Sequence, residues 1–138
     1  MSGIYVLDAC ALTALFKKED GVDEVVAIYK KAVAGEIKLV MNKLNLLETY
    51  YDQYRSIGKS VADKSLASVK KSPIVIISEI SDAVFAEAGR LKASYRISLA
   101  DSIALAEASV SDGTLLTADH HELDMVEKKE RIKFYWIR

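Results

Sequence analysis

The chain has 138 residues, of which 51% are hydrophobic and 28% are charged, a composition typical of one globular domain and not of a disordered protein. The formal net charge of −1 excludes a general basic surface for nucleic acid, so a phosphate ligand would need local basic residues, a metal ion, or both. The single cysteine, Cys10, excludes an internal disulfide, and no apolar stretch approaches the roughly 20 residues of a membrane-spanning helix. Because the N-terminus also lacks a signal-peptide core, we expect a soluble cytoplasmic protein with no membrane association.

Short apolar runs alternate with helical patterns along the chain. In order, the sequence predicts a strand over 4–7, a short helix through Leu12 and Phe16, a helix over 22–34, a strand over 37–41, helices over 44–57 and 61–71, a strand over 74–77, helices over 81–95 and 99–112, a strand over 114–117, a short helix over 122–129 and a strand over 132–137. Alternation of this kind, with nearly continuous apolar strands, indicates a single α/β domain over residues 1–138. Its mostly parallel central sheet should be flanked by helices on both faces.

Four acidic residues stand where these apolar runs stop or where helical patterns begin: Asp8, Glu48, Asp101 and Asp119. In an open parallel sheet these places are neighbours, because ligands bind outside the carboxyl ends of the strands. Four carboxylates gathered there would repel one another strongly unless a cation lay between them. A set of oxygen ligands favours Mg²⁺ or Mn²⁺ over zinc. The sequence therefore predicts a divalent metal site.

Each of these acids also has a purely structural interpretation. Ser98 to Asp101 and Asn45 to Glu48 have the form of capping boxes, and Asp8 and Asp119 suit helix caps or turns. Singly, a cap is the more frequent role, but caps do not require four separate segments to converge at one end of a sheet. The other acids are interpreted as solvated or helix-dipole charges, among them Glu19, Glu107, Glu122 and Asp124, and His120 as a surface histidine.

The motifs around the four acids resemble those of PIN-domain ribonucleases, and most closely the VapC toxins of prokaryotic toxin–antitoxin pairs. The matching segments are residues 7–12, Glu48, residues 98–104 and residues 116–119, so the resemblance covers essentially the whole chain. It implies a five-stranded parallel sheet, a Mg²⁺- or Mn²⁺-dependent endoribonuclease, a homodimer and an antitoxin partner. It also implies metal-site roles for the four acids and supporting polar roles for Thr117 and Ser98. Ala9 and Cys10 depart from the family pattern, which often has Ser or Thr there.

The chemistry also follows from the residues. A metal held by Asp8, Asp101 and Asp119 would acidify its bound water for in-line attack on an RNA phosphodiester, with Glu48 as a second-metal ligand or as the group that orients the water. Arg96 and Lys43 are the candidate phosphate contacts, although solvated surface charge is at least as good an interpretation.

Three other functions compete with this one. This chain lacks the acidic pair that a receiver domain has after its first strand. It also lacks the second Asp of a dehalogenase-type phosphatase, since Cys10 stands at that position. The remaining alternative is a catalytically inactive PIN-like protein-binding module with a structural metal. The stripe of Leu44, Leu47, Tyr51 and Tyr54 is either core, the default, or part of a partner groove. We expect helices 22–34 and 44–54 to line the antitoxin groove.

Overall fold

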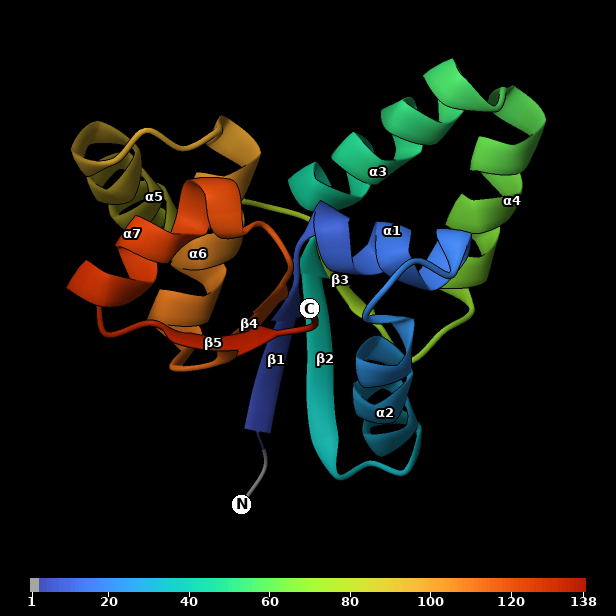
Figure 1. Cartoon of the computed structure of the whole chain (residues 1–138), viewed down its shortest axis with the longest axis horizontal. Helices are drawn as coiled ribbons and strands as arrows, with labels where there is room; N and C mark the ends of the chain where they lie inside the picture. Colours follow the sequence, from blue (N-terminus) through green and yellow to red (C-terminus); the bar gives the residue numbers. More distant parts are fainter. Residues whose placement is uncertain (1–2) are drawn as a thin grey trace.

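A computed structural model describes residues 3–138 of the protein (Figure 1). Within that range the strands are β1 (Gly3–Leu7), β2 (Ile37–Asn42), β3 (Val75–Ile77), β4 (Thr114–Thr117) and β5 (Lys133–Trp136). The helices are α1 (Ala9–Lys17), α2 (Val22–Val33), α3 (Lys43–Ser56), α4 (Lys59–Lys70), α5 (Asp82–Ser94), α6 (Leu99–Ser111) and α7 (His120–Lys129). All the predicted elements exist, and their bounds agree with the predicted ones to within two residues.

The strands form one sheet with the order β3-β2-β1-β4-β5, and across the described residues every neighbouring pair is parallel. The predicted α/β fold is thus confirmed, with a wholly parallel sheet. The chain first builds outward from β1 to β2 and β3, and then returns to the other side of β1 to add β4 and β5. This reversal leaves a crevice between the carboxyl ends of β1 and β4, where ligands bind in folds of this kind.

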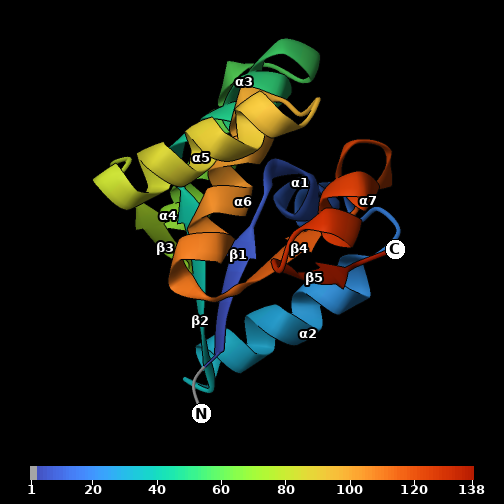
Figure 2. The ribbon, with the colours of Figure 1, turned by 90° about the vertical axis from the view of Figure 1, so that its left-hand side faces the viewer.

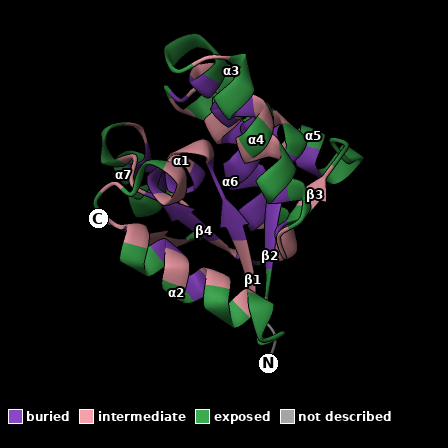
Figure 3. Ribbon diagram, turned by 90° about the vertical axis from the view of Figure 1, so that its right-hand side faces the viewer, coloured by how far each residue is buried: buried purple, intermediate pink, exposed green. Residues whose placement is uncertain are grey.

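Helices cover both faces of the sheet because strand side chains alternate between two apolar cores (Figure 2). Val6 and Leu115 face a core built largely by α5, α6 and α7, whereas Leu7 and Leu116 face one built by α1, α2 and α4. Buried residues concentrate on the strands and on α6 (Figure 3), whose consecutive residues 102–108 are all buried. The apolar residues around the circumference of this helix had predicted that burial.

Helix α3 follows β2 directly and extends beyond the carboxyl edge of the sheet, with α4 folding back beside it (Figure 1). It packs against α1, α4 and α6, so it forms a wall next to the crevice between β1 and β4. This arrangement brings helix side chains of α3 and α6 to the edge where β1 and β4 end.

The last residues of the chain are held against the turn between α1 and α2. The Arg138 guanidinium donates to the Asp20 carbonyl over 2.5 Å, and the His120 ring bonds the Arg138 carbonyl over 2.8 Å. Gly21 has a φ of 93°, and a Cβ there would lie 2.5 Å from the Ile137 carbonyl oxygen. Only glycine therefore permits this close approach.

No helix within residues 3–138 is long and apolar enough to cross a membrane.

Candidate metal centre

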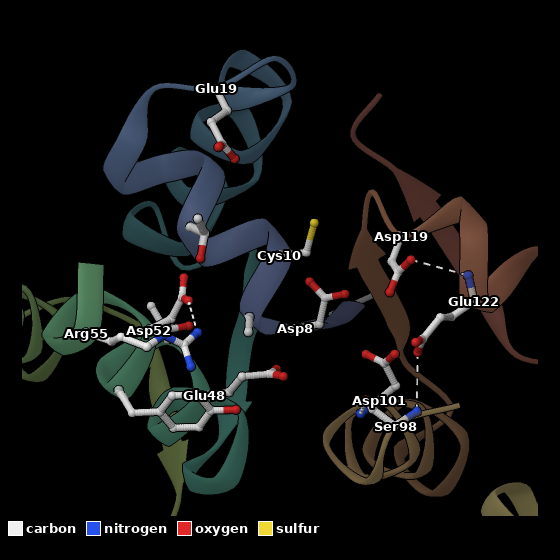
Figure 4. A pocket seen from close by; sticks show the side chains of 14 residues that line it. Asp8, Cys10, Glu19, Glu48, Asp52, Arg55, Ser98, Asp101, Asp119 and Glu122 are labelled. Atoms are coloured by element: carbon white, nitrogen blue, oxygen red, sulfur yellow. Dashed lines mark hydrogen bonds and ion pairs between the residues drawn. The ribbon is translucent and has the colours of Figure 1, made fainter. Parts of the chain in front are cut away.

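The four acids singled out in the sequence line one cavity of about 390 Å³ at the carboxyl edge of the sheet (Figure 4). Asp8 follows β1 and Asp119 follows β4, so the two flank the crevice at the reversal of strand order. Glu48 reaches the cavity from α3 and Asp101 from α6. The predicted convergence of Asp8, Glu48, Asp101 and Asp119 is therefore present in the fold.

Asp8 lies at the floor of the site, with only 2% of its surface exposed. It caps α1, because its Oδ1 accepts from the Ala11 amide over 2.8 Å. Burial raises the pKa of Asp8 to about 7, and repulsion from Asp119 and Glu48 adds to that rise. A hydrogen bond from the Thr117 hydroxyl to the Asp8 carboxylate lowers this pKa. The oxygen of the same hydroxyl accepts a hydrogen bond from the Asp119 amide over 3.1 Å. Thr117 thus joins the two acids that flank the crevice.

Asp101, Asp119 and Glu122 form the tightest group of acids, each offering a carboxylate oxygen within 4.8 Å of the others. Burial raises the pKa of Asp101 strongly, and a hydrogen bond to Glu122 and repulsion from Asp8 raise it further. The same hydrogen bond lowers the pKa of Glu122, so a proton on Asp101 is shared with its neighbour. Burial also raises the pKa of Glu48, with repulsion from Asp52 contributing.

Glu122 is the site residue that the sequence interpretation missed. The sequence predicts only a helix-dipole role for it, and it does lie in the first turn of α7. Its carboxylate nevertheless reaches across to α6, where Oε2 accepts from the Ser98 amide over 3.3 Å. The signal in the sequence was its spacing: it stands three residues after Asp119, whose side chain caps the same helix turn by accepting from the Glu122 amide.

The capping interpretations are right in part. Ser98 caps α6, since its Oγ accepts from the Asp101 amide over 3.0 Å. In a capping box the Asp101 carboxylate would accept from the Ser98 amide, but here the Glu122 carboxylate accepts that bond. The Asp101 carboxyl group is therefore free to face the cavity. The box from Asn45 to Glu48 is wrong, because α3 begins earlier and Asn42 is its cap. Asn45 is instead buried inside α3 and donates to the Ala100 carbonyl over 2.9 Å. That bond fixes the helix of Glu48 against the segment that carries Asp101.

Glu107 also differs from its interpretation as a solvated charge. Only 7% of its surface is exposed, and it accepts from the Asn42 side-chain amide over 2.7 Å. Since the Asn42 oxygen caps α3 at the same time, one side chain connects β2, α3 and α6. The buried pair therefore connects the elements that carry Glu48 and Asp101.

The two candidate phosphate contacts lie outside the cavity. Arg96 and Lys43 are exposed, and neither lines it. Arg55 of α3 does line it, although the sequence interpretation did not single it out. Cys10 lines it too, and burial next to Asp8 raises the pKa of its thiol to about 11, so the thiol stays neutral.

The chemistry of these residues fits a hard divalent cation. The clustered groups are carboxylates, which are the ligands that Mg²⁺ and Mn²⁺ prefer. The pKa values of Asp8, Glu48 and Asp101 are raised because the acids are desolvated and lie near one another. A cation among them would remove that repulsion and let all three ionise.

The comparison of the sequence with protein-family models decides the family. The PIN domain model matches residues 5–129. The chain belongs to the PIN domain family. The acidic cavity at the carboxyl edge is thus a feature of a PIN domain, and the resemblance seen in the sequence is confirmed.

Solved structures give the same fold at low sequence identity. VapBC2 from Rickettsia felis, bound to a DNA fragment from its promoter, has a TM-score of 0.76 and 17% identity over 96% of this chain and 98% of that one. VapBC-1 from nontypeable Haemophilus influenzae has a TM-score of 0.71 and 15% identity over 97% and 98% of the two chains. DNA-bound VapBC from Salmonella typhimurium has a TM-score of 0.71 and 14% identity over the whole of both. Curated protein sequences contain no match to this chain.

Proposed function

We propose that this PIN domain is a metal-dependent endoribonuclease and the toxin of a VapBC-type toxin–antitoxin pair. The observation that carries the proposal is the convergence of Asp8, Glu48, Asp101 and Asp119 from four separate segments on one cavity. Helix capping explains the positions of two of these acids, but it gives no reason for all four to meet. The structural likeness to VapBC complexes supports the same function.

In this proposal Asp8, Asp101 and Asp119 hold Mg²⁺ or Mn²⁺, with Glu122 as a further ligand. When bound, such a cation supplies an acidified water and offsets the charge of the phosphodiester. Glu48 stands on the α3 wall, opposite Asp101 (Figure 4), and its raised pKa suits a carboxylate that orients the attacking water and accepts its proton. Thr117 holds Asp8 and the backbone of Asp119 in place.

The proposed antitoxin has a candidate docking groove on the face opposite α6. An apolar groove of about 380 Å³ lies between α1, α2 and α4, lined by Leu12, Leu15, Phe16, Val26, Tyr29, Val69 and Ile74. From the sequence, we expect α2 and α3 to line the antitoxin groove. This groove is lined by α2, as expected, but its other walls are α1 and α4 and not α3. An amphipathic helix of the antitoxin would lay its apolar face there. The family resemblance further implies a homodimer, which light scattering would test.

The decisive experiment is RNA cleavage by purified protein. We expect cleavage of RNA in Mg²⁺ or Mn²⁺ and none in EDTA, with Asp8→Asn inactive under both conditions. Asn still caps α1, so loss of activity in this variant reports the carboxylate and not an unfolded helix. Binding of Mn²⁺, followed by its electron paramagnetic resonance signal, should weaken in the same variant and gives a readout that does not depend on activity.

The alternative, a protein-binding PIN-like module with a structural metal, makes the opposite predictions. Such a protein would bind Mn²⁺ yet leave RNA intact at every metal concentration. Expressed without a partner in bacteria, the wild type should slow growth and Asp8→Asn should not. Equal growth of the two strains at matched expression, together with intact RNA, would favour the module.

A further inference from the structure

Helix α3 presents a second set of functional groups to the cavity beyond Glu48. Tyr51, Asp52 and Arg55 also line it, and their spacing of three, four and seven residues from Glu48 places them on one face of the helix. In Figure 4, Glu48, Asp52 and Arg55 come from the same helix, and the Glu48 carboxylate points toward Asp101 on the other side. With a rise of about 1.5 Å per residue, Arg55 lies roughly 10 Å along the helix from Glu48. The α3 wall is therefore long enough to contact a nucleotide next to the reacting phosphate.

The charges of the cavity make Arg55 stand out. Seven acids line it: Asp8, Glu19, Glu48, Asp52, Asp101, Asp119 and Glu122. Among the described residues of the lining, Arg55 is the only lysine or arginine. Its guanidinium lies 2.9 Å from Asp52, but the two side chains are 73% and 42% exposed. Ion pairs this exposed are weak, so the guanidinium is able to exchange Asp52 for a phosphate.

Tyr51 supplies an aromatic surface next to that cation. The residue is 47% exposed although its ring is apolar, so it does not serve the core as the default interpretation of its stripe had it. The Arg55 guanidinium carbon lies 5.9 Å from the centroid of the Tyr51 ring. Unpaired RNA bases stack on aromatic rings and on arginine planes of this kind.

We propose that Tyr51 and Arg55 form a subsite for an unpaired nucleotide of the RNA substrate, next to the phosphodiester at the acidic cluster. Tyr51 stacks on the base, and Arg55 binds the phosphate farther from Glu48. The subsite rests on the proposed ribonuclease function and adds a requirement to it: the substrate must be single-stranded at this nucleotide. A base within a duplex has no free face to offer the ring.

The chain offers a matched control for Tyr51. Tyr54 lies on the same helix and is also 47% exposed, but it does not line the cavity. The probe is a short single-stranded RNA with one 2-aminopurine, bound in Ca²⁺ in place of Mg²⁺. We expect stacking to quench its fluorescence on wild type, Tyr51→Phe and Tyr54→Ala. Tyr51→Ala should lose the quench and bind about 5- to 150-fold more weakly.

Kinetics on cleavable RNA give the second readout. Tyr51→Ala should raise KM with little change in kcat, because a base stacked away from the reacting bond contributes equally to ground and transition states. Tyr51→Phe should restore KM, and Arg55→Gln should raise it. Equal quenching and equal KM for Tyr51→Ala and Tyr54→Ala would overturn the subsite while leaving the ribonuclease intact.

Failure of the ribonuclease proposal gives a different pattern. In that case wild type would not cut RNA, and the quenching assay alone would decide whether Tyr51 binds a base. If Tyr51→Ala bound and cleaved RNA normally but escaped inhibition by a protein partner, this face would be a protein anchor, and the subsite would be wrong.

Discussion

The Asp8 carboxyl is buried, so its ionisation links metal binding to stability. Its pKa is about 7 in the folded protein against 3.8 for a free side chain, which means that the folded state holds the proton more tightly. A raised pKa contributes stability below the unfolded value, and that contribution is lost as pH rises through the folded one. For a shift of this size, the free energy of unfolding should fall by about 4 kcal/mol between a pH below the unfolded pKa and a pH above the folded one.

We therefore expect the metal-free protein to melt at a lower temperature at pH 8 than at pH 5.5. Thermal melts in chelator would measure this, and Asp8→Asn should weaken the dependence without abolishing it, because the pKa values of Asp101 and Glu48 are raised as well. Adding Mn²⁺ at pH 7 should release protons, detectable by calorimetry in two buffers of different ionisation enthalpy. A wild-type melting temperature that rises with pH in chelator would contradict the assignment.

Asp101 allows the cap and the metal site to be tested separately. Because Ser98 caps α6, replacing Asp101 with Asn exchanges a partly buried carboxyl group for a neutral amide of similar size without removing the cap. Asp101→Asn should leave the metal-free protein as stable as wild type or more so, while abolishing RNA cleavage. Ser98→Ala is the contrasting variant, expected to cost about 1 kcal/mol in urea denaturation. Strong destabilisation by Asp101→Asn would mean that this acid is chiefly structural.

Acidic residues at strand ends and at helix starts predicted four members of the candidate site, but the sequence did not indicate Glu122 or Arg55. The four acids could be found because their positions follow from the strand and helix pattern alone. Glu122 enters only because its side chain crosses from α7 to α6, and Arg55 only because α3 extends beyond the sheet. Contacts between elements of this kind depend on helix packing, which hydrophobic periodicity does not encode.

Among the elements, the connection made by Asn42 carries the largest expected effect on stability. Its oxygen caps α3 and its amide satisfies the buried Glu107. Asn42→Ala removes the cap and also leaves a carboxylate buried without its donor, so we expect a loss of roughly 3 kcal/mol in urea denaturation. Ser81→Ala is the matched control, since Ser81 only caps α5 and its loss should cost about 1 kcal/mol.

Asn42→Ser separates the two roles, because serine keeps a cap but cannot reach Glu107. Stability of Asn42→Ser equal to wild type would mean that the pairing with Glu107 contributes nothing.

Element order and type were predictable because each apolar run is bounded by Gly, Pro or capping residues. The starts of α3 and α7 were predicted one and two residues too late, because their caps, Asn42 and Asp119, stand at the end of β2 and two residues after β4. The stripe of α3 was also misjudged. Leu44 packs against the core as expected, whereas Leu47, Tyr51 and Tyr54 are exposed, because α3 buries the face that carries Leu46, Thr49 and Gln53.

Across the whole molecule, the charge distribution predicts an unusual dependence of RNA binding on salt. The net charge is −1, and one cation faces the seven acids of the cavity. If Arg55 makes the one phosphate contact, the logarithm of the binding constant should fall with the logarithm of the KCl concentration with a slope of about −0.7. Fluorescence titrations at fixed Ca²⁺ would measure it, and Arg55→Gln should bring the slope near zero. A slope several times steeper would point to a basic surface elsewhere.

The attachment of the chain end to the turn at Gly21 has a practical consequence for preparing the protein. A peptide fused after Arg138 would begin between Asp20 and His120, where the terminal residue is already engaged on both sides. β1 starts at the opposite edge of the sheet from the acidic cavity, far from this attachment (Figure 1). Purification handles, fluorophores and surface-immobilisation tags therefore belong before β1, and enzymatic assays on C-terminally tagged protein would first need a check of its melting temperature.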